Sequence, residues 1–359
     1  IAHGSNLRDF GYTYNSFLIS PAAKVVMSEI LLIIIAMLTF VSAAHTDELS
    51  GNDKKLPTMM AEKKELLDSD DEGLPLATYK ITGLAEKIKT ERYAAKNPYL
   101  LLPHKPNYFM PLTYQTKINQ EEQEKFYQGI AELDDEAGNE GKSFENTEFV
   151  FQLSMKFIIA EDVFGKYSNL AVAYSVKSYW QAYNRKISAL FRETNYEPEI
   201  ILGFNSGFDW SDHMTIAFNH QSNGQVGNLS RSWNRIIVST AKIWPDRILK
   251  VRAWYRIPEK EKETPSAVQG DDNPDILKYM GYGDVFYLRK IGEHSLAITA
   301  RNNLRSADNL GSVELDWTFP LLGGMKGFVQ YFNGYGESLI DYNQYQERIG
   351  VGIKISDWL

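Results

Sequence analysis

The stretch that decides the fold is Ile248–Ile257, which reads ILKVRAWYRI. Four apolar residues alternate in it with three basic residues and a tryptophan: Leu249, Val251, Ala253 and Tyr255 against Lys250, Arg252, Trp254 and Arg256. Side chains two residues apart on a β-strand point to the same face of the sheet. The stretch therefore predicts a strand with one apolar face and one charged face.

The same alternation recurs from about Asn97 to the end of the chain, in short runs separated by Gly, Asn, Asp and Pro. We count twelve runs: Asn107–Gln115, Glu148–Ile158, Asn169–Tyr183, Pro198–Phe208, Asp212–Ser222, Asn234–Trp244, Ile248–Ile257, Lys278–Lys290, His294–Arg301, Gly311–Pro320, Lys326–Phe332 and Arg348–Leu359.

Two architectures produce this alternation, a soluble β-sandwich and a membrane barrel, and the aromatic residues distinguish them. Tyr and Trp gather at the run ends, as the interfacial girdles of a membrane barrel require: Tyr179, Trp180, Trp210, Trp233, Trp244, Tyr279, Tyr282 and Trp358. An even number of runs and a strand at the C-terminus favour the same solution. The fold class we predict is all-β, a 12-stranded antiparallel transmembrane β-barrel over residues 97–359.

The N-terminal part is predicted to direct export. The apolar run Ile30–Ala44 is too short to span a membrane comfortably and ends in small residues that suit signal-peptidase cleavage. We expect residues 1–26 to be an extension that is not native, residues 27–44 to be a signal peptide starting at Met27, and residues 45–96 to be an acidic periplasmic extension or linker. A core strand or helix is the alternative for the apolar run.

The composition excludes some classes of catalysis and of binding partner. The chain of 359 residues has no cysteine, which excludes thiol catalysis and Cys-ligated metals. Its net charge of −8 argues against nucleic acid as a partner.

The candidate catalytic residues lie in Phe218–Arg235, FNHQSNGQVGNLSRSWNR. His220 and Ser222 share a strand face, and a hairpin symmetric about Gly227 would bring Asn234 opposite His220. His220 can then take the proton of Ser222, while the amide oxygen of Asn234 accepts from the other ring nitrogen. A His-x-Ser pair on a strand is by itself weak evidence, because most such pairs form a polar rim. The other members of this face are Met214, Ile216 and Phe218, so the nucleophile would lie on the apolar surface.

Five segments then resemble the bacterial outer-membrane phospholipase A family, in the same order. They are FRETNYEP at Phe191–Pro198, NHQSNG at Asn219–Gly224, SRSWNR at Ser230–Arg235, DDNPDILKYMGYG at Asp271–Gly283 and GYGESLIDYN at Gly334–Asn343. The resemblance implies an enzyme that hydrolyses sn-1 and sn-2 acyl esters of phospholipids and of lysophospholipids in the outer membrane. It also implies a homodimer that is active with Ca²⁺, and an active site towards the outer leaflet.

Carried over by position, the resemblance implies Ser222 as nucleophile, His220 as general base and Asn234 as orienting residue. Gly224 can present its backbone N–H to the oxyanion. The implied calcium ligands are the Ser230 hydroxyl, the Gln225 carbonyl and Ser188 from the partner subunit, with Asp272 at a second site. A solvated turn is the alternative interpretation of the acidic cluster around Asp272.

Three positions depart from the family pattern. Gln225 replaces the usual Arg, and Val176 replaces a Gln that hydrogen-bonds across the dimer, while the chain ends in Leu359 instead of an aromatic residue. The alternative function is a passive porin or structural barrel, in which Lys250 and Arg252 would line a channel. That class of protein has no use for Ser, His and Asn converging on a lipid-facing surface.

Overall fold

The computed structural model describes residues 100–119, 121, 143–165, 168–189, 191–264, 267, 270–321 and 325–356, all within one compact unit, Glu72–Leu359. The predictions for residues 1–26, 27–44 and 45–96, and for Trp358, lie outside the described residues. No helix in the described ranges is long and apolar enough to cross a membrane.

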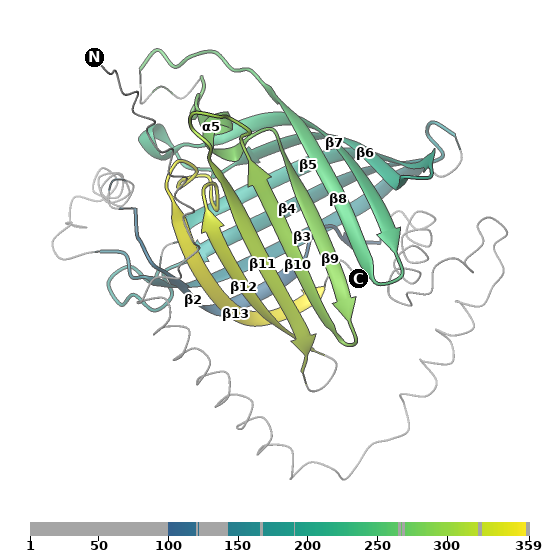
Figure 1. Ribbon diagram of the computed structural model, residues 1–359. Helices are drawn as coiled ribbons and strands as arrows, with labels where there is room; N and C mark the ends of the chain where they lie inside the picture. The colour runs from purple at the N-terminus through teal and green to yellow at the C-terminus, as the bar shows by residue number, and fades with distance from the viewer. Residues whose placement is uncertain are drawn as a thin grey trace, which may run out of the picture. The chain divides into compact units, whose positions relative to one another are not determined.

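Twelve antiparallel strands form a closed barrel (Figure 1). Each strand pairs with the next one in the chain, and β2 pairs with both β13 and β3, which closes the sheet. The barrel strands are β2 (Asn107–Gln115), β3 (Thr147–Glu161), β4 (Asn169–Trp180), β5 (Phe191–Phe208), β6 (Ser211–Ser222), β7 (Ser232–Trp244), β8 (Arg247–Ile257), β9 (Gly283–Ile291), β10 (His294–Asn302), β11 (Gly311–Pro320), β12 (Lys326–Gly334) and β13 (Gln346–Ser356). An additional strand of two residues, β1 (Leu102–Pro103), pairs with β3.

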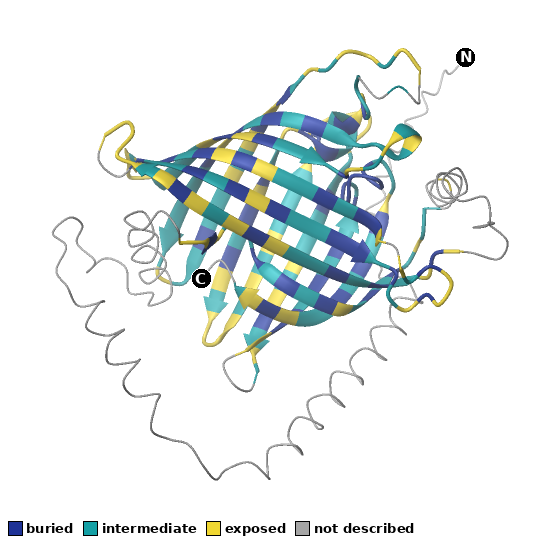
Figure 2. Ribbon diagram, turned by 180° about the vertical axis from the view of Figure 1, so that it is seen from behind, coloured by how far each residue is buried: buried dark blue, intermediate teal, exposed yellow. Residues whose placement is uncertain are grey.

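The barrel exposes apolar side chains and buries charged ones. Phe218 is 44% exposed and Tyr255 is 64% exposed, whereas Arg235, Arg256 and Glu199 are buried. Figure 2 shows this alternation as a chequered pattern along the strands. A soluble sandwich requires the opposite arrangement, with the apolar face in the core and the polar face in water. The outer surface is therefore the lipid-facing band of a membrane barrel, and the predicted fold class is confirmed.

Ion pairs cross the interior of the barrel. Arg192 donates to Glu148 at 2.7 Å and to Asp341 at 2.6 Å, and Arg252 donates from Nε to Asp284 at 2.8 Å. Buried charges are stable only when they are paired and hydrogen-bonded, so these contacts rigidify the interior. Lys250 and Arg252, which the porin alternative places along a channel, thus lie in an interior that is bridged by side chains.

One predicted strand is wrong at its start. The run Lys278–Lys290 begins as a short helix, α5 (Ile276–Met280), and only then continues as β9. Ile276 and Met280 are buried against Leu339 and Tyr342, so tertiary packing overrides the local alternation. Gly281 ends the helix with a φ of 66°, and a β-carbon there would lie 2.6 Å from the carbonyl oxygen of Asn302.

Other boundaries also differ. β5 begins at Phe191, whereas the prediction began at Pro198, since proline is unusual inside a strand. Tyr196 and Glu199 of β5 both pair with β6, whereas the two residues between them do not. This interruption accommodates the missing N–H of Pro198.

The prediction of the residues that form the aromatic girdle is also partly wrong. Tyr179 and Trp233 are fully buried, because their positions in the alternation point them into the barrel, and Tyr279 packs against the interior cluster. Trp210 and Tyr282 are exposed, as a girdle requires.

The topology places the unusual polar segments at one end of the barrel. Connections between β4 and β5, β6 and β7, β8 and β9, and β12 and β13 all leave from the same rim, because antiparallel strands alternate in direction. These connections carry Ser188, the segment 223–231, the acidic cluster and the segment 335–345. The candidate catalytic and calcium-binding segments therefore share one rim.

Candidate active site

The hairpin of β6 and β7 brings His220 and Asn234 together. The two residues are register partners, as the expected symmetry about Gly227 requires. His220 Nδ1 and Asn234 Oδ1 are 2.9 Å apart. Because an amide oxygen can only accept, Nδ1 carries the proton and Nε2 remains free to act as a base.

Ser222 ends the same strand two residues further on, so it shares the outer face with His220. Its register partners are Tyr196 of β5 and Ser232 of β7. The next residues below on this face are Phe218 and Ile216, both exposed. The pair of polar side chains therefore lies at the upper edge of the lipid-facing band.

Asn234 also has a partner on its far side. Its Nδ2 donates to Oε1 of Glu259 at 3.1 Å. Sequence reasoning missed Glu259, because β8 was expected to end at Ile257 and the following residues were treated as a loop. In the structure Ile257 is the register partner of Asn234, and Glu259 follows two residues later.

Asn223 organises the segment that follows Ser222. Its side-chain oxygen accepts from the backbone N–H of Gln225 at 3.3 Å and of Arg231 at 2.9 Å. Its amide donates to the Leu229 carbonyl at 2.8 Å and to Glu193 at 3.2 Å. Asn223 and Glu193 are both buried, so this loop is held from inside the barrel mouth. Neither residue was singled out from the sequence.

Gly224 lies in the left-handed region, with a φ of 67°. A β-carbon at this position would be 3.0 Å from the ring of Tyr196. Glycine therefore suits both the backbone conformation and the tight approach of the two strands.

Asp272 joins the acidic cluster to the start of β7. Its Oδ2 accepts from the Ser230 hydroxyl at 2.8 Å and from the Ser232 hydroxyl at 3.1 Å. Its Oδ1 is buried without a hydrogen bond and faces the Lys262 ammonium at 2.5 Å. Carboxylate and hydroxyl oxygens are ligands that Ca²⁺ prefers, so these residues fit the metal once Lys262 moves away.

The other two candidate calcium ligands make different contacts. The backbone N–H of Gln225 bonds to Asn223, and the carbonyl of Ser188 accepts from Trp180 Nε1 at 2.7 Å. Within the described ranges, no group of three or more His, Asp or Glu residues could hold a metal by itself. Ser188 is expected to act from the partner subunit.

The rest of the acidic cluster is built into the rim. Asn273 is fully buried and exchanges two hydrogen bonds with the backbone of Ser232, at 3.1 and 3.0 Å. Asp271 pairs with Arg256, and Asp275 accepts from the Tyr342 hydroxyl. Burial and the neighbouring Asp275 carboxylate raise the pKa of Tyr342 well above its usual value. The cluster is therefore a turn that is solvated in part, since Pro274 and Asp275 are exposed whereas Asn273 is buried.

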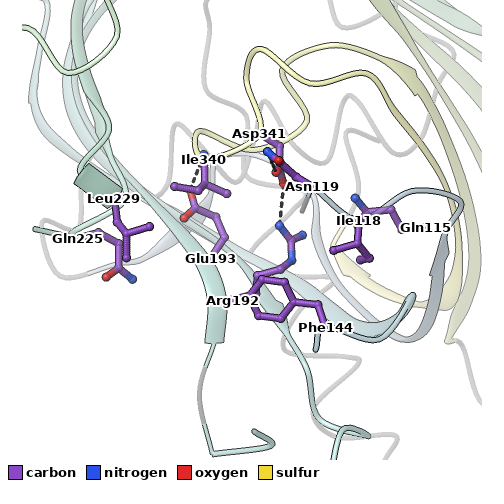
Figure 3. A pocket seen from close by; sticks show the side chains of 10 residues that line it. All are labelled: Gln115, Ile118, Asn119, Phe144, Arg192, Glu193, Gln225, Leu229, Ile340 and Asp341. Carbon is purple, nitrogen blue, oxygen red and sulfur yellow. Dashed lines mark hydrogen bonds and ion pairs between the residues drawn. The ribbon is translucent and has the colours of Figure 1, made fainter. Parts of the chain in front are cut away.

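A cavity lies inside the barrel mouth, separate from the catalytic candidates. It is lined by Gln115, Ile118, Asn119, Phe144, Arg192, Glu193, Gln225, Leu229, Ile340 and Asp341. Figure 3 shows Arg192 and Asp341 facing each other in it. Its lining includes Gln225 but not His220, Ser222 or Asn234. A substrate from the membrane would meet the outer face, so this cavity is not the candidate active site.

The fold and the rim together define a transmembrane barrel that carries enzyme-like chemistry on its outer face. Residues 84–355 match the family described as phospholipase A1. Phospholipase A1 of Klebsiella pneumoniae is 35% identical over 265 residues, covering 73% of this chain and 84% of that protein. Phospholipase A1 of Escherichia coli K12 is 34% identical over 267 residues, covering 73% and 83%.

Solved structures agree with these relatives. Outer membrane phospholipase A from Escherichia coli superposes with a TM-score of 0.61 at 34% identity, covering 73% of this chain and 94% of that one. The Salmonella typhi outer membrane phospholipase, a dimer with bound calcium, superposes with a TM-score of 0.63 at 33% identity, covering 74% and 96%. The chain therefore belongs to the phospholipase A1 family. The resemblance is confirmed, and the protein is a phospholipase of the outer membrane.

Proposed function

We propose that this protein is a calcium-dependent phospholipase that cleaves sn-1 and sn-2 acyl esters of phospholipids and lysophospholipids through His220, Ser222 and Asn234. The observation that carries the proposal is the 2.9 Å contact between His220 Nδ1 and Asn234 Oδ1, with Ser222 on the same lipid-facing surface. A lipid in the outer leaflet can present its ester to this edge without leaving the membrane.

In the first half of the reaction, Ser222 Oγ attacks the ester carbonyl and its proton passes to His220 Nε2. Asn234 Oδ1 accepts from Nδ1 throughout, which keeps the basic nitrogen turned towards Ser222. A neutral amide stabilises the imidazolium less than a carboxylate would. The backbone N–H of Gly224 is the group that we assign to the oxyanion.

The second half regenerates the enzyme. His220 returns its proton to the leaving alcohol, which departs as a lysophospholipid or a glycerol derivative. A water molecule then gives a proton to His220 and attacks the acyl-serine ester, the bond to Ser222 Oγ breaks, and His220 passes the proton to Oγ as the fatty acid is released. The same steps apply to either glycerol position, because the exposed apolar face beside Ser222 does not enclose the acyl chain.

The Ser230 hydroxyl, the Gln225 carbonyl and Ser188 of a second copy are the groups that would hold calcium in the dimer, and Asp272 would serve a second site beside Ser230. When bound, calcium supplies positive charge that polarises the oxyanion donors. Support for this part comes from the Ser230–Asp272 contact and from the calcium-bound dimer of the Salmonella typhi relative. Ligands from two subunits would make activity depend on homodimer formation.

The test is fatty-acid release from detergent-dispersed phosphatidylethanolamine by the refolded protein, with calcium and with a chelator. We expect calcium-dependent release that Ser222→Ala abolishes and that Ser295→Ala, a serine on β10 away from the rim, leaves unchanged. Substrates with different acyl chains at sn-1 and sn-2 report the position of cleavage. Release that survives Ser222→Ala refutes the assignment of the nucleophile.

A passive porin or structural barrel is the competing function. The ion pairs that cross the interior and the family both disfavour it. A correctly folded dimeric barrel that releases no fatty acid would restore it.

A further inference from the structure

We infer that Glu259 is a positioning residue that sets the orientation of the Asn234 amide and, through it, the tautomer of His220. The inference rests on the proposed function, because it assigns a fourth residue to the same catalytic set. Its structural basis is the 3.1 Å hydrogen bond from Asn234 Nδ2 to Glu259 Oε1.

An asparagine amide has two ends of nearly equal size and opposite hydrogen-bonding character. If the oxygen faces His220, Nδ1 donates and Nε2 is a base. If the NH₂ group faces His220, Nδ1 must accept, the ring proton moves to Nε2, and the ring can no longer take a proton from Ser222. His220 alone does not choose between these states, because neutral imidazole can donate or accept at either nitrogen.

Glu259 makes the choice because an ionised carboxylate can only accept. Its oxygen requires the NH₂ end of Asn234 on its side, which turns Oδ1 towards His220 Nδ1 at 2.9 Å. A triad that contains aspartate needs no such partner, since both ends of its carboxylate are acceptors. The asparagine is therefore the reason that a further residue is needed.

Glu259 lies in the connection that follows β8, the strand next to Asn234. Ile257, the last residue of β8, is the register partner of Asn234, and Glu259 follows it by two residues. Glu259 is partly buried, whereas its neighbours Lys260 and Glu261 are exposed. The contact therefore follows from sheet geometry as well as from loop conformation.

The experiment measures kcat, KM and the rate of covalent labelling by a fluorophosphonate probe. In labelling, Ser222 Oγ forms a bond to phosphorus, the P–F bond breaks, fluoride leaves, and the serine proton passes to His220. The rate thus reports the state of the base without any lipid. Glu259→Ala is compared with Glu259→Gln, which retains an acceptor oxygen, and with Glu261→Ala, which removes the same charge from an exposed neighbour.

We expect Glu259→Ala to lower both kcat and the labelling rate by about tenfold with KM unchanged, as for the loss of a hydrogen bond to a charged group. Glu259→Gln should fall between Glu259→Ala and the wild type, about threefold below the wild type, because its amide can still accept from Asn234 but can also turn its NH₂ group towards it. Glu261→Ala should have no effect.

A double substitution separates positioning from general structural support. In an Asn234→Asp background the side chain at residue 234 has no amide to orient, so Glu259→Ala should cost nothing and should relieve repulsion between two carboxylates. An equal loss in both backgrounds overturns the inference, because it would mean that Glu259 only supports the fold. Circular dichroism of each variant checks that the barrel has formed.

The outcomes distinguish this inference from the function beneath it. An active, labelled wild type beside an unimpaired Glu259→Ala overturns the role of Glu259 alone. A folded wild type that neither releases fatty acid nor reacts with the probe overturns the proposed function, and the role of Glu259 with it.

Discussion

The Lys262 ammonium lies beside Asp272, where a bound cation would lie. Removing the Lys262 side chain should therefore tighten calcium binding. The ammonium lies 2.5 Å from Asp272 Oδ1, and the two side chains are only 11% and 7% exposed. A calcium ion bound at Asp272, as proposed, would compete with Lys262 for one carboxylate. The perturbation is Lys262→Ala, with Lys260→Ala as a control that removes the same charge from an exposed position in the same segment.

The magnitude follows from the strength of the contact. A close charge pair that is largely buried contributes about 1.5 kcal/mol, and about 1.4 kcal/mol corresponds to a factor of ten. Lys262 then covers the carboxylate in roughly nine of ten molecules, which weakens apparent calcium affinity about tenfold. Lys262→Ala should lower the dissociation constant by that factor, and Lys260→Ala should leave it within about twofold, since exposed charges are screened.

Isothermal titration of calcium into the refolded protein measures the constant directly. Thermal unfolding gives a second readout: without calcium, Lys262→Ala leaves a buried carboxylate without its counter-charge and should lower Tm, and saturating calcium should restore it. Unchanged or weaker binding by Lys262→Ala, beside a wild type that binds calcium, would refute the competition. Absence of binding by both proteins would refute the calcium site at Asp272.

Three further changes test the rim and the dimer. Asn223→Ala removes four hydrogen bonds within and below the segment 223–231. It should lower the free energy of unfolding by about 1–3 kcal/mol and remove most of the lipase activity. Thermal unfolding and fatty-acid release measure the two effects. Gly224→Ala must accept a φ of 67° and a close contact with Tyr196. It should lower the free energy of unfolding by about 1–2 kcal/mol and lower kcat. Labelling by the fluorophosphonate probe reports whether Ser222 is still reactive. Val176→Gln places an amide on the outer face opposite Leu153, and should raise the fraction of dimer that sedimentation in detergent measures. An unchanged fraction would mean that residue 176 is not part of the dimer interface.

Much of the barrel was predictable because alternation is a local property. Along β8, Val251 and Tyr255 are exposed while Trp254 and Arg256 are buried, as their positions in the run indicate. The pairing of His220 with Asn234 was predictable for the same reason, since a hairpin relates residues that are close in sequence. Tyr179 shows the limit of composition, because an aromatic residue near a strand end is a girdle residue only if it also points outward.

Contacts between distant segments were not predictable. Asp272 meets Ser230 from 42 residues away, and Asn223 meets Glu193 from 30 residues away across the barrel mouth. Helix α5 forms because Ile276 and Met280 find an apolar cluster that includes Leu339, which no local pattern reveals.

The sequence by itself determined which face of each strand meets lipid and which three side chains form the catalytic candidate, because the two-residue period of a strand and a short hairpin set both locally. Only the tertiary structure decided what surrounds those side chains. The connection that follows β8 brings Glu259 to Asn234 and Lys262 to Asp272. Both contacts depend on the relative position of strands and loops, which the alternation of side chains along one strand does not contain.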